Sequence, residues 1–184
     1  MQQHMDTLQT PDGVPLHTIH WLPDASPKAV VLIAHGLAEH SGRYAHVAAY
    51  LVERGYAVYA IDHRGHGKSP GLRAYFETFN EPVADLKLYL DRVKMAQPGL
   101  PVFLYGHSLG ALISLAFTLT HQRELAGLIL SGAPVAVGDA QPAPLVAVSA
   151  ALSRFVPTLP LVALDSKGLS HDLAVVQAYD NDPL

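Results

Sequence analysis

Residues 102–110 read VFLYGHSLG, and this stretch decides the fold. An apolar, β-branched and aromatic run (101–105) enters the pattern G-x-S-x-G at 106–110, and a strongly apolar segment (109–120) with helical character follows. In a strand–turn–helix context, this pattern places the central serine on a strained turn that lifts its hydroxyl clear of the sheet edge. We therefore expect Ser108 to be a nucleophile.

The residues flanking Ser108 fit this interpretation. Gly106 and Gly110 leave room for the neighbouring strand and helix, where side chains would clash. His107 completes the turn as a supporting residue. Because the next helix starts beside Ser108, its free N–H groups and its dipole can stabilise a developing oxyanion.

A second oxyanion donor is expected from the loop after the first core strand. That loop is residues 35–42, HGLAEHSG. The backbone N–H groups of Leu37 and Leu109 are the natural pair of donors, with His35 and Gly36 as supporting residues. Gly36 lets the main chain approach the serine closely.

Strands and helices alternate on both sides of this motif. This alternation predicts an α/β fold with a doubly wound, mainly parallel sheet, preceded by an N-terminal hairpin. The hairpin strands are expected at 5–9 and 15–22, and the core strands at 29–34, 56–61, 101–105 and 127–131. The helices are expected at 44–54, at 83–95 with Pro82 as the first helical residue, and at 109–120.

The pattern changes after the last of these strands. Prolines interrupt an apolar, alanine-rich stretch, in which we expect one helix near 145–155 and another near 175–179. We divide the chain into the N-terminal part of a core (1–133) and a separate, proline-interrupted segment (134–184). No further apolar strand of this kind is expected before Leu184.

Composition narrows the classes of protein. The chain has 184 residues, 49% hydrophobic and 15% charged, with a formal net charge of −4. Without a basic excess, nucleic acid is not an expected partner. With no cysteine, disulfides and thiolate metal sites are excluded. No signal peptide or span of about 20 apolar residues is visible, so we expect a cytoplasmic protein.

Histidines crowd the loops that follow the strands. We interpret them as loop hydrogen-bonding residues rather than as a metal centre, and we expect no metal or cofactor. The loop 62–69, DHRGHGKS, lacks the strand-to-helix pattern of a phosphate-binding loop. We expect Asp62 and Arg64 to satisfy polar groups of the structure near the site.

Three motifs together carry a family resemblance. They are the G-x-S-x-G pattern at 106–110, HGLAEHSGRY (35–44) and DHRGHGKS (62–69). Together they resemble the monoacylglycerol lipase and lysophospholipase branch of the α/β-hydrolases. The closing segment 164–184, with LDSKGLS and AYDNDPL, resembles the part of that family's lid that leads back to the core. The resemblance implies a cofactor-free serine hydrolase acting on a small lipid ester with one acyl chain. It also implies Ser108 as nucleophile and Leu37 and Leu109 as oxyanion donors. It further implies that residues 134–184 form a helical cap or lid, with peripheral membrane contact through this cap, and that the C-terminal strands of the sheet are missing from this chain.

The acid and base of a catalytic triad are harder to place. In this fold they follow the serine along the chain, and only His121 and His171 do so. His121 ends the helix that Ser108 begins, about 20 Å away along its axis, and His171 lies with Asp172 in the lid-like segment. Asp139 is a weak candidate for the acid. The family places acid and base after the lid, so we expect both to be absent from this chain.

Three hypotheses remain open. The chain is the front part of a monoacylglycerol lipase or esterase, or a half-enzyme completed by a second chain, or a catalytically inactive chain that binds lipid or a partner. In each case residues 128–130 form an exposed apolar edge, which a second chain or self-association would cover.

Overall fold

The computed structural model describes residues 1–135 and 166–184. These residues belong to two units, Met1–Val135 and Ala136–Leu184, and each is described by itself.

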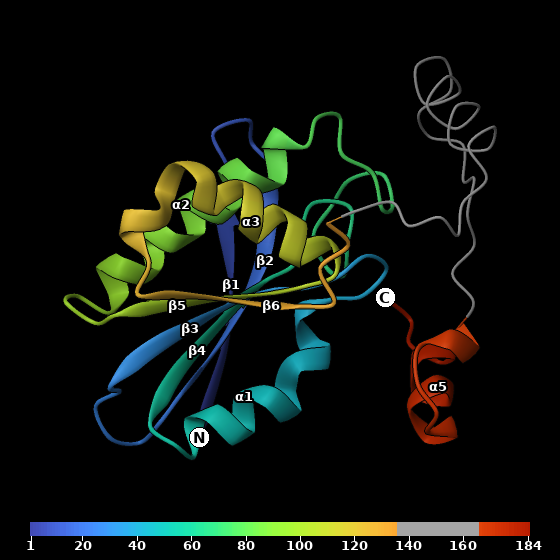
Figure 1. Cartoon of the computed structure of the whole chain (residues 1–184), viewed down its shortest axis with the longest axis horizontal. Helices are drawn as coiled ribbons and strands as arrows, with labels where there is room; N and C mark the ends of the chain where they lie inside the picture. Colours follow the sequence, from blue (N-terminus) through green and yellow to red (C-terminus); the bar gives the residue numbers. More distant parts are fainter. Residues whose placement is uncertain (136–165) are drawn as a thin grey trace. The chain divides into compact units, whose positions relative to one another are not determined.

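The first unit is built on a six-stranded sheet with strand order β1-β2-β4-β3-β5-β6. The strands are β1 (Gln2–Gln9), β2 (Pro15–Leu22), β3 (Ala29–Ala34), β4 (Tyr56–Ile61), β5 (Val102–His107) and β6 (Gly127–Ser131). The β1–β2 hairpin is antiparallel and joins β4 antiparallel, whereas β4, β3, β5 and β6 run parallel. This confirms the predicted doubly wound, mainly parallel sheet with an N-terminal hairpin (Figure 1).

Helices cover the sheet on both faces. Helix α1 (Ala45–Val52) lies on one face, and α2 (Asn80–Ala96) and α3 (Leu109–His121) lie on the other (Figure 1). The short 3₁₀ turns η1 (Ser41–Tyr44) and η2 (Gln122–Glu124) precede α1 and follow α3. This two-sided cover explains why all six residues of β3 are buried, as its unbroken apolar sequence predicts.

Two helices of the first unit differ from the prediction by more than one residue at one end. The helix expected at 44–54 is shorter, because η1 takes Tyr44 and Glu53 is already the C-cap of α1. Helix α2 begins at Asn80, so Pro82 is its third residue rather than its first. Proline is tolerated there because the N–H groups of the first turn have no intrahelical acceptor.

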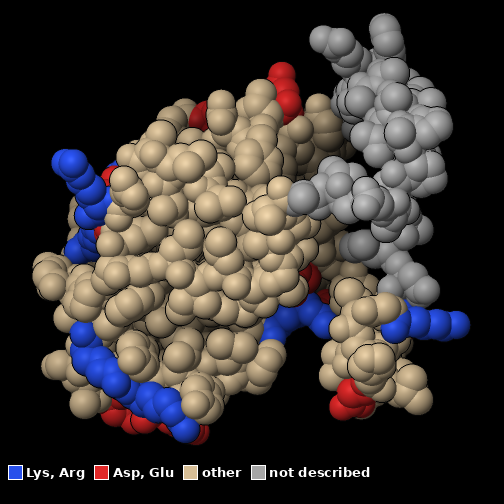
Figure 2. All heavy atoms as spheres, viewed as in Figure 1, with Lys and Arg blue, Asp and Glu red and all other residues tan. Residues whose placement is uncertain are grey.

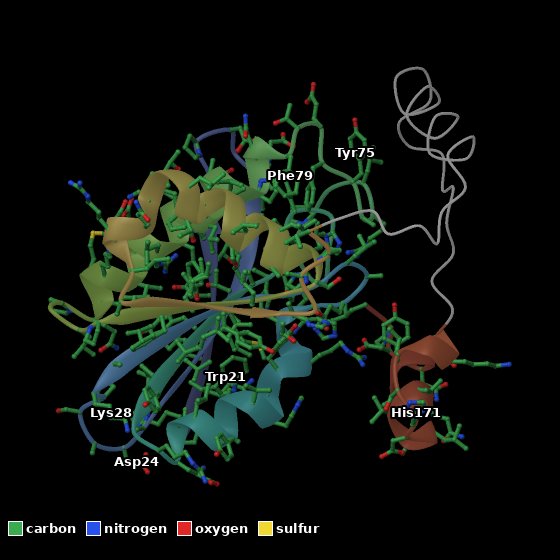
Figure 3. All side chains as sticks on the ribbon, in the orientation of Figure 1. Trp21, Asp24, Lys28, Tyr75, Phe79 and His171 are labelled. Carbon is green, nitrogen blue, oxygen red and sulfur yellow. The ribbon has the colours of Figure 1, made fainter. Side chains whose placement is uncertain are left out.

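The hydrophobic core lies in two layers, one on each face of the sheet. Under α2 and α3, the fully buried side chains include Leu32, Leu104 and Phe117. Under α1, the core is built around Trp21, Ile33 and Val58. Trp21 is fully buried between the sheet and α1 (Figure 3).

Strand β6 ends the sheet, and no strand of the described residues pairs with its outer side. Ile129 is 45% exposed and Leu130 38% exposed, so the apolar edge predicted from the sequence is present. Figure 2 shows a face of the molecule on which residues without charge predominate, with Lys and Arg scattered. An unpaired apolar edge of this kind is a site for adding another strand.

The described part of the second unit contains η3 (Ser166–Gly168) and α5 (Leu173–Asp180). The Asp172 carboxylate accepts the Ala174 N–H at 2.9 Å and so caps α5. The helix predicted at 175–179 lies within α5, whereas the one predicted near 145–155, and Asp139, fall outside the described residues. Among the described residues, no helix has the length and apolar character needed to cross a bilayer.

Candidate active site

Ser108 lies on the turn between β5 and α3 with φ 50° and ψ −114°. A non-glycine residue at positive φ costs on the order of 1–3 kcal/mol and persists only where its surroundings enforce it. Here the Ser108 N–H donates to the Ser131 carbonyl at 2.9 Å, and the Ser108 carbonyl accepts from the Ala111 N–H at 2.9 Å. Hydrogen bonds on both sides therefore hold the strained turn.

Tight packing explains the two glycines of the motif. A Cβ at Gly106 would stand 2.5 Å from Ser114 Oγ and 2.7 Å from the Cα of Ala111. A Cβ at Gly110 would collide with the carbonyl oxygens of Ala34 and His35. Both positions therefore need glycine, as the sequence predicts.

The loop after β3 lies beside this turn because of the strand register. Ala34 pairs with Gly106, so the carboxyl ends of β3 and β5 are adjacent. A Cβ added to Gly36 would be 3.3 Å from the Ser108 Cβ and 3.2 Å from His107 Cδ2. The structure thus brings Gly36, His107 and Ser108 together.

His35 fixes the direction of the Gly36–Leu37 peptide. Its Nε2 accepts the His63 N–H at 3.0 Å, so the neutral ring carries its proton on Nδ1 and donates to the Gly36 carbonyl at 2.8 Å. Burial lowers the pKa of His35 to about 3, which keeps the ring neutral. Because C=O and N–H point in opposite directions across a trans peptide, the Leu37 N–H faces away from the His35 ring.

Leu109 is the first residue of α3, so its N–H has no intrahelical acceptor. It directly follows Ser108 at the positive end of the helix dipole. Leu37 lies in the facing loop and is 42% exposed. The two N–H groups proposed from the sequence thus belong to separate segments, the loop after β3 and the first turn of α3.

Sequence reasoning missed two residues of the site. Glu39 Oε1 accepts hydrogen bonds from the Gly36 N–H and from the Tyr44 hydroxyl, the latter at 2.8 Å. Ser131 accepts the Ser108 N–H through its carbonyl, and its Oγ lies 3.2 Å from His107 Nδ1. Only the spacing of Glu39, three residues after Gly36, was available as a signal.

The loop 62–69 has the structural role predicted for it. Asp62 is buried, and its carboxylate accepts the N–H groups of Ser41 at 2.7 Å and Lys68 at 2.9 Å. Arg64 donates twice to the buried Asp85 carboxylate, with both N···O distances 2.7 Å. These hydrogen bonds connect the loop to η1 and α2. Asp62 and Arg64 therefore interact with other groups of the protein rather than with a ligand.

Of the two candidate bases, His121 lies at the opposite end of α3 from Ser108. His121 ends α3, where its Nδ1 lies 3.1 Å from Glu124 Oε1 and its ring contacts Phe117. His171 is an exposed residue of the second unit (Figure 3). Within the first unit as described, no histidine nitrogen is hydrogen-bonded to Ser108.

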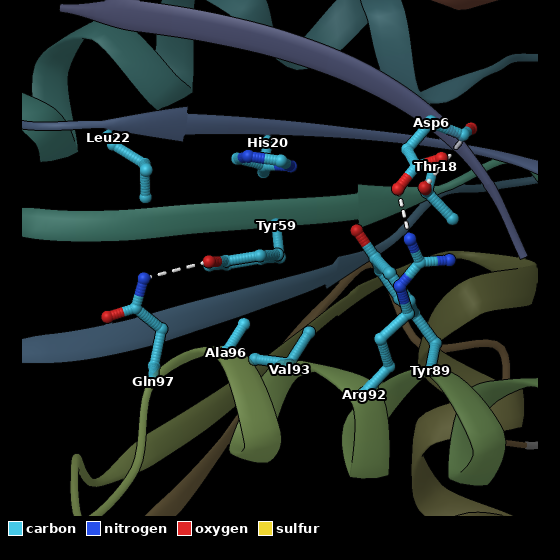
Figure 4. Close-up of a pocket in the computed structure, with 10 residues that line it drawn as sticks. All are labelled: Asp6, Thr18, His20, Leu22, Tyr59, Tyr89, Arg92, Val93, Ala96 and Gln97. Carbon is cyan, nitrogen blue, oxygen red and sulfur yellow. Dashed lines mark hydrogen bonds and ion pairs between the residues drawn. The ribbon is translucent and has the colours of Figure 1, made fainter.

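A separate recess of about 320 Å³ lies between the sheet and α2 (Figure 4). His20 and Tyr59 stack in it with ring centroids 5.0 Å apart, and Gln97 donates to the Tyr59 hydroxyl at 2.9 Å. Arg92 is paired with the Asp6 carboxylate at its other end. None of the residues predicted for the site lines this recess.

This protein is an α/β-hydrolase. The class is defined by the doubly wound sheet, by the strained serine after β5, and by the glycine-containing loop that packs against that serine. A family model described as "Serine aminopeptidase, S33" matches residues 25–184, and the chain belongs to this family.

Individual relatives agree with this assignment. The monoacylglycerol lipase of Mycolicibacterium smegmatis is 40% identical over 89% of this chain and 59% of its own length. The human monoglyceride lipase is 36% identical over 99% of this chain and 60% of its own length. The crystal structure of Paleococcus ferrophilus monoacylglycerol lipase aligns with a TM-score of 0.79 at 33% identity, covering 92% of this chain and 63% of that one. The chain therefore spans about 60% of the length of the curated relatives it matches.

Proposed function

We propose that this chain carries the nucleophile and the oxyanion hole of a serine hydrolase that cleaves carboxylic esters of single acyl chains. Ser108 is the nucleophile, and the N–H groups of Leu37 and Leu109 are the oxyanion donors. The observation that carries the proposal is the Ser108 backbone at φ 50° directly before α3, with Gly36 packed against its Cβ.

The proposed reaction begins with attack of Ser108 Oγ on the ester carbonyl. A base removes the hydroxyl proton, the carbonyl oxygen becomes an oxyanion, and the two N–H groups stabilise it. Collapse of the tetrahedral intermediate releases the alcohol, which takes the proton, and leaves an acyl-serine. Water then attacks the acyl-serine and releases the fatty acid, which restores the hydroxyl.

We place the acid and base of the triad in polypeptide beyond the described residues. Two observations support this part of the proposal. In the first unit as described, no histidine is hydrogen-bonded to Ser108, and the curated relatives are longer than this chain. The exposed edge at β6 is where additional strands carrying these residues would join the sheet.

A lipid ester is the proposed substrate class. The M. smegmatis and human relatives are named monoacylglycerol lipase and monoglyceride lipase. Residues 134–184 would form the cap over the acyl chain, and their sequence is rich in apolar residues. No cofactor is needed for this chemistry.

The alternative is a chain that binds lipid or a partner without turnover. The exposure of Ile129 and Leu130 favours it, because these side chains form an apolar surface without any contribution from Ser108. The proposed hydrolysis requires the Ser108 hydroxyl, whereas binding without turnover does not.

The test is hydrolysis of p-nitrophenyl butyrate and of 1-monooleoylglycerol. The chain is assayed alone and after extension with the remaining C-terminal portion of the M. smegmatis relative. We expect slow turnover alone and a large gain on extension, and we expect this gain to be lost in Ser108→Ala and retained in Ser26→Ala, a matched exposed serine. Activity of the extended chain that survives Ser108→Ala would overturn the proposal, and binding without any turnover would support the alternative.

A further inference from the structure

We infer that Glu39 is a positioning residue that holds the Gly36–Leu37 segment in the geometry an oxyanion requires. This inference rests on the proposed function, in which the Leu37 N–H donates a hydrogen bond to the oxyanion. Glu39 does not touch the reacting atoms; it acts through the backbone of Gly36.

The first observation is that the Glu39 carboxylate reaches back along its own loop. Its Oε1 accepts the Gly36 N–H, three residues earlier in the chain. The same oxygen accepts the Tyr44 hydroxyl at 2.8 Å, and Arg43 Nε lies 4.0 Å from Oε2. Hydrogen bonds to an ionised acceptor are shorter and stronger than neutral ones, so this carboxylate is a firm anchor for the loop.

The second observation is that the anchor lies next to the serine. A Cβ at Gly36 would stand 2.7 Å from Glu39 Oε1 on one side and 3.3 Å from the Ser108 Cβ on another. Gly36 therefore lies between the carboxylate and the nucleophile. A displacement of Glu39 is passed to the Leu37 N–H through a single residue.

The third observation concerns the two peptide groups that flank Gly36. His35 holds the Gly36 carbonyl, and Glu39 holds the Gly36 N–H. Both planes are then fixed, and the Leu37 N–H is left directed away from the buried His35 ring. The bond to Glu39 also occupies the Gly36 N–H, so Leu37 rather than Gly36 is the donor in this loop.

The fourth observation is backbone strain in the same loop. Ala38 lies at φ 54°, in the left-handed region that disfavours residues with a Cβ. Such a conformation persists where neighbouring contacts enforce it. The Glu39 side chain, which closes the loop across Ala38 onto Gly36, is such a contact.

The burial of Glu39 and Tyr44 makes this arrangement rigid. The Glu39 side chain is only 16% exposed, and Tyr44 is 6% exposed. Tyr44 also contacts the Tyr105 ring edge to face, which links the anchor to β5, the strand that leads into the turn at Ser108. Burial and the Glu39 carboxylate together raise the pKa of Tyr44, so its hydroxyl stays a donor.

The experiment compares Glu39→Gln with Glu53→Gln, a carboxylate on the exposed end of α1 that serves as the matched control. Amide resonances of Gly36 and Leu37 are recorded without ligand, and n-butylboronic acid is then titrated as a probe that forms a tetrahedral adduct on Ser108. We expect Glu39→Gln to shift both resonances and to weaken boronate affinity about 10- to 100-fold. We expect Glu53→Gln to change neither.

Unchanged Gly36 and Leu37 resonances in Glu39→Gln would overturn the inference. If that variant does not fold, a scalar coupling across the hydrogen bond from the Gly36 nitrogen to the Glu39 carboxyl carbon in the wild-type chain decides the question, and its absence counts against Glu39. Failure of the proposed function is seen separately, as boronate binding that is absent in the wild type or persists in Ser108→Ala. The amide measurements on the free chain still decide the role of Glu39 in that case.

Discussion

Gly36 and Ser108, 72 positions apart in the sequence, lie so close that a methyl group on Gly36 would stand 3.3 Å from the Ser108 Cβ. The same methyl group would be 2.7 Å from Glu39 Oε1. The loop after β3 and the turn after β5 are therefore fitted to each other as one surface, and the consequences of disturbing that fit can be measured.

Gly36→Ala is expected to destabilise the fold by about 1–3 kcal/mol, because an added methyl group forces the tightly packed neighbours apart. The measurement is the free energy of unfolding in urea. Gly168→Ala is the control, since a Cβ at Gly168 meets nothing within 4 Å. Equal stabilities of the two variants would show that the loop accommodates the added methyl group without cost, which would contradict the tight packing at Gly36.

Ser108→Gly is expected to raise stability by about 1 kcal/mol, because glycine adopts φ 50° without the cost that a Cβ imposes. Ser108→Ala keeps the Cβ and should show no such gain. The difference between the two unfolding midpoints therefore isolates the backbone strain. A strained turn would be ruled out by a Ser108→Gly variant no more stable than Ser108→Ala.

Acid should destabilise the fold through its buried histidines. The pKa of His35 falls from 6.5 to about 3 in the folded chain, mainly through burial. Its stabilising contribution is complete above pH 6.5 and is lost as the pH falls, because the unfolded chain then binds a proton that the folded chain does not. From pH 7 to pH 5 the loss is about 2 kcal/mol for this residue, and burial also lowers the pKa of His63.

Unfolding free energies at pH 7 and pH 5 test this dependence. His35→Gln should reduce the difference between the two values, whereas His46→Gln, at an exposed position of α1, should leave it unchanged. A difference that His35→Gln does not alter would contradict the assignment.

Arg64→Ala should cost about 3–5 kcal/mol, because it leaves the buried Asp85 carboxylate without its charged partner. Arg54→Ala is the control, since Arg54 is 48% exposed and its ion pair with Glu53 spans 3.9 Å. We expect that control to lie within about 0.5 kcal/mol of the wild type. Thermal or urea unfolding measures both, and a similar small effect at Arg64 would contradict a structural role for its loop.

Ile129→Lys should reduce self-association of the chain, because a charge on β6 opposes pairing along the open edge. Light scattering across a concentration series measures the effect. Leu119→Lys, at a 79% exposed position of α3, is the matched control and should change association less. If Leu119→Lys reduced association more than Ile129→Lys, the surface responsible for association would lie away from β6.

The sequence predicted the elements whose own residues determine them. The unbroken apolar run of β3 indicated a strand covered on both faces, and G-x-S-x-G between a strand and a helix indicated the turn at Ser108. Local signals were weaker at helix starts. At α2, the helix begins at Asn80, before Pro82, and the Glu81 carboxylate accepts the N–H groups of Glu77 and Thr78 in the segment that precedes it.

The contacts of the site could not be predicted, because they join distant residues. The bond from the Ser108 N–H to the Ser131 carbonyl depends on the pairing of β5 with β6. The hydrogen bond from the His63 N–H to His35 Nε2 likewise depends on β3 and β4 lying side by side. Glu39 was within reach of local reasoning, but only the folded loop shows that its carboxylate turns back onto Gly36.

The central claim is that Ser108 is an ester-cleaving nucleophile in a preformed oxyanion hole. Intact-protein mass spectrometry after exposure to p-nitrophenyl butyrate tests it most directly, with peptide mapping of any adduct. An oxyanion hole without its base retains part of its rate enhancement, so we predict one butyryl group per chain, on Ser108, absent from Ser108→Ala. A chain that stays unmodified, or one modified equally in Ser108→Ala, would contradict the claim.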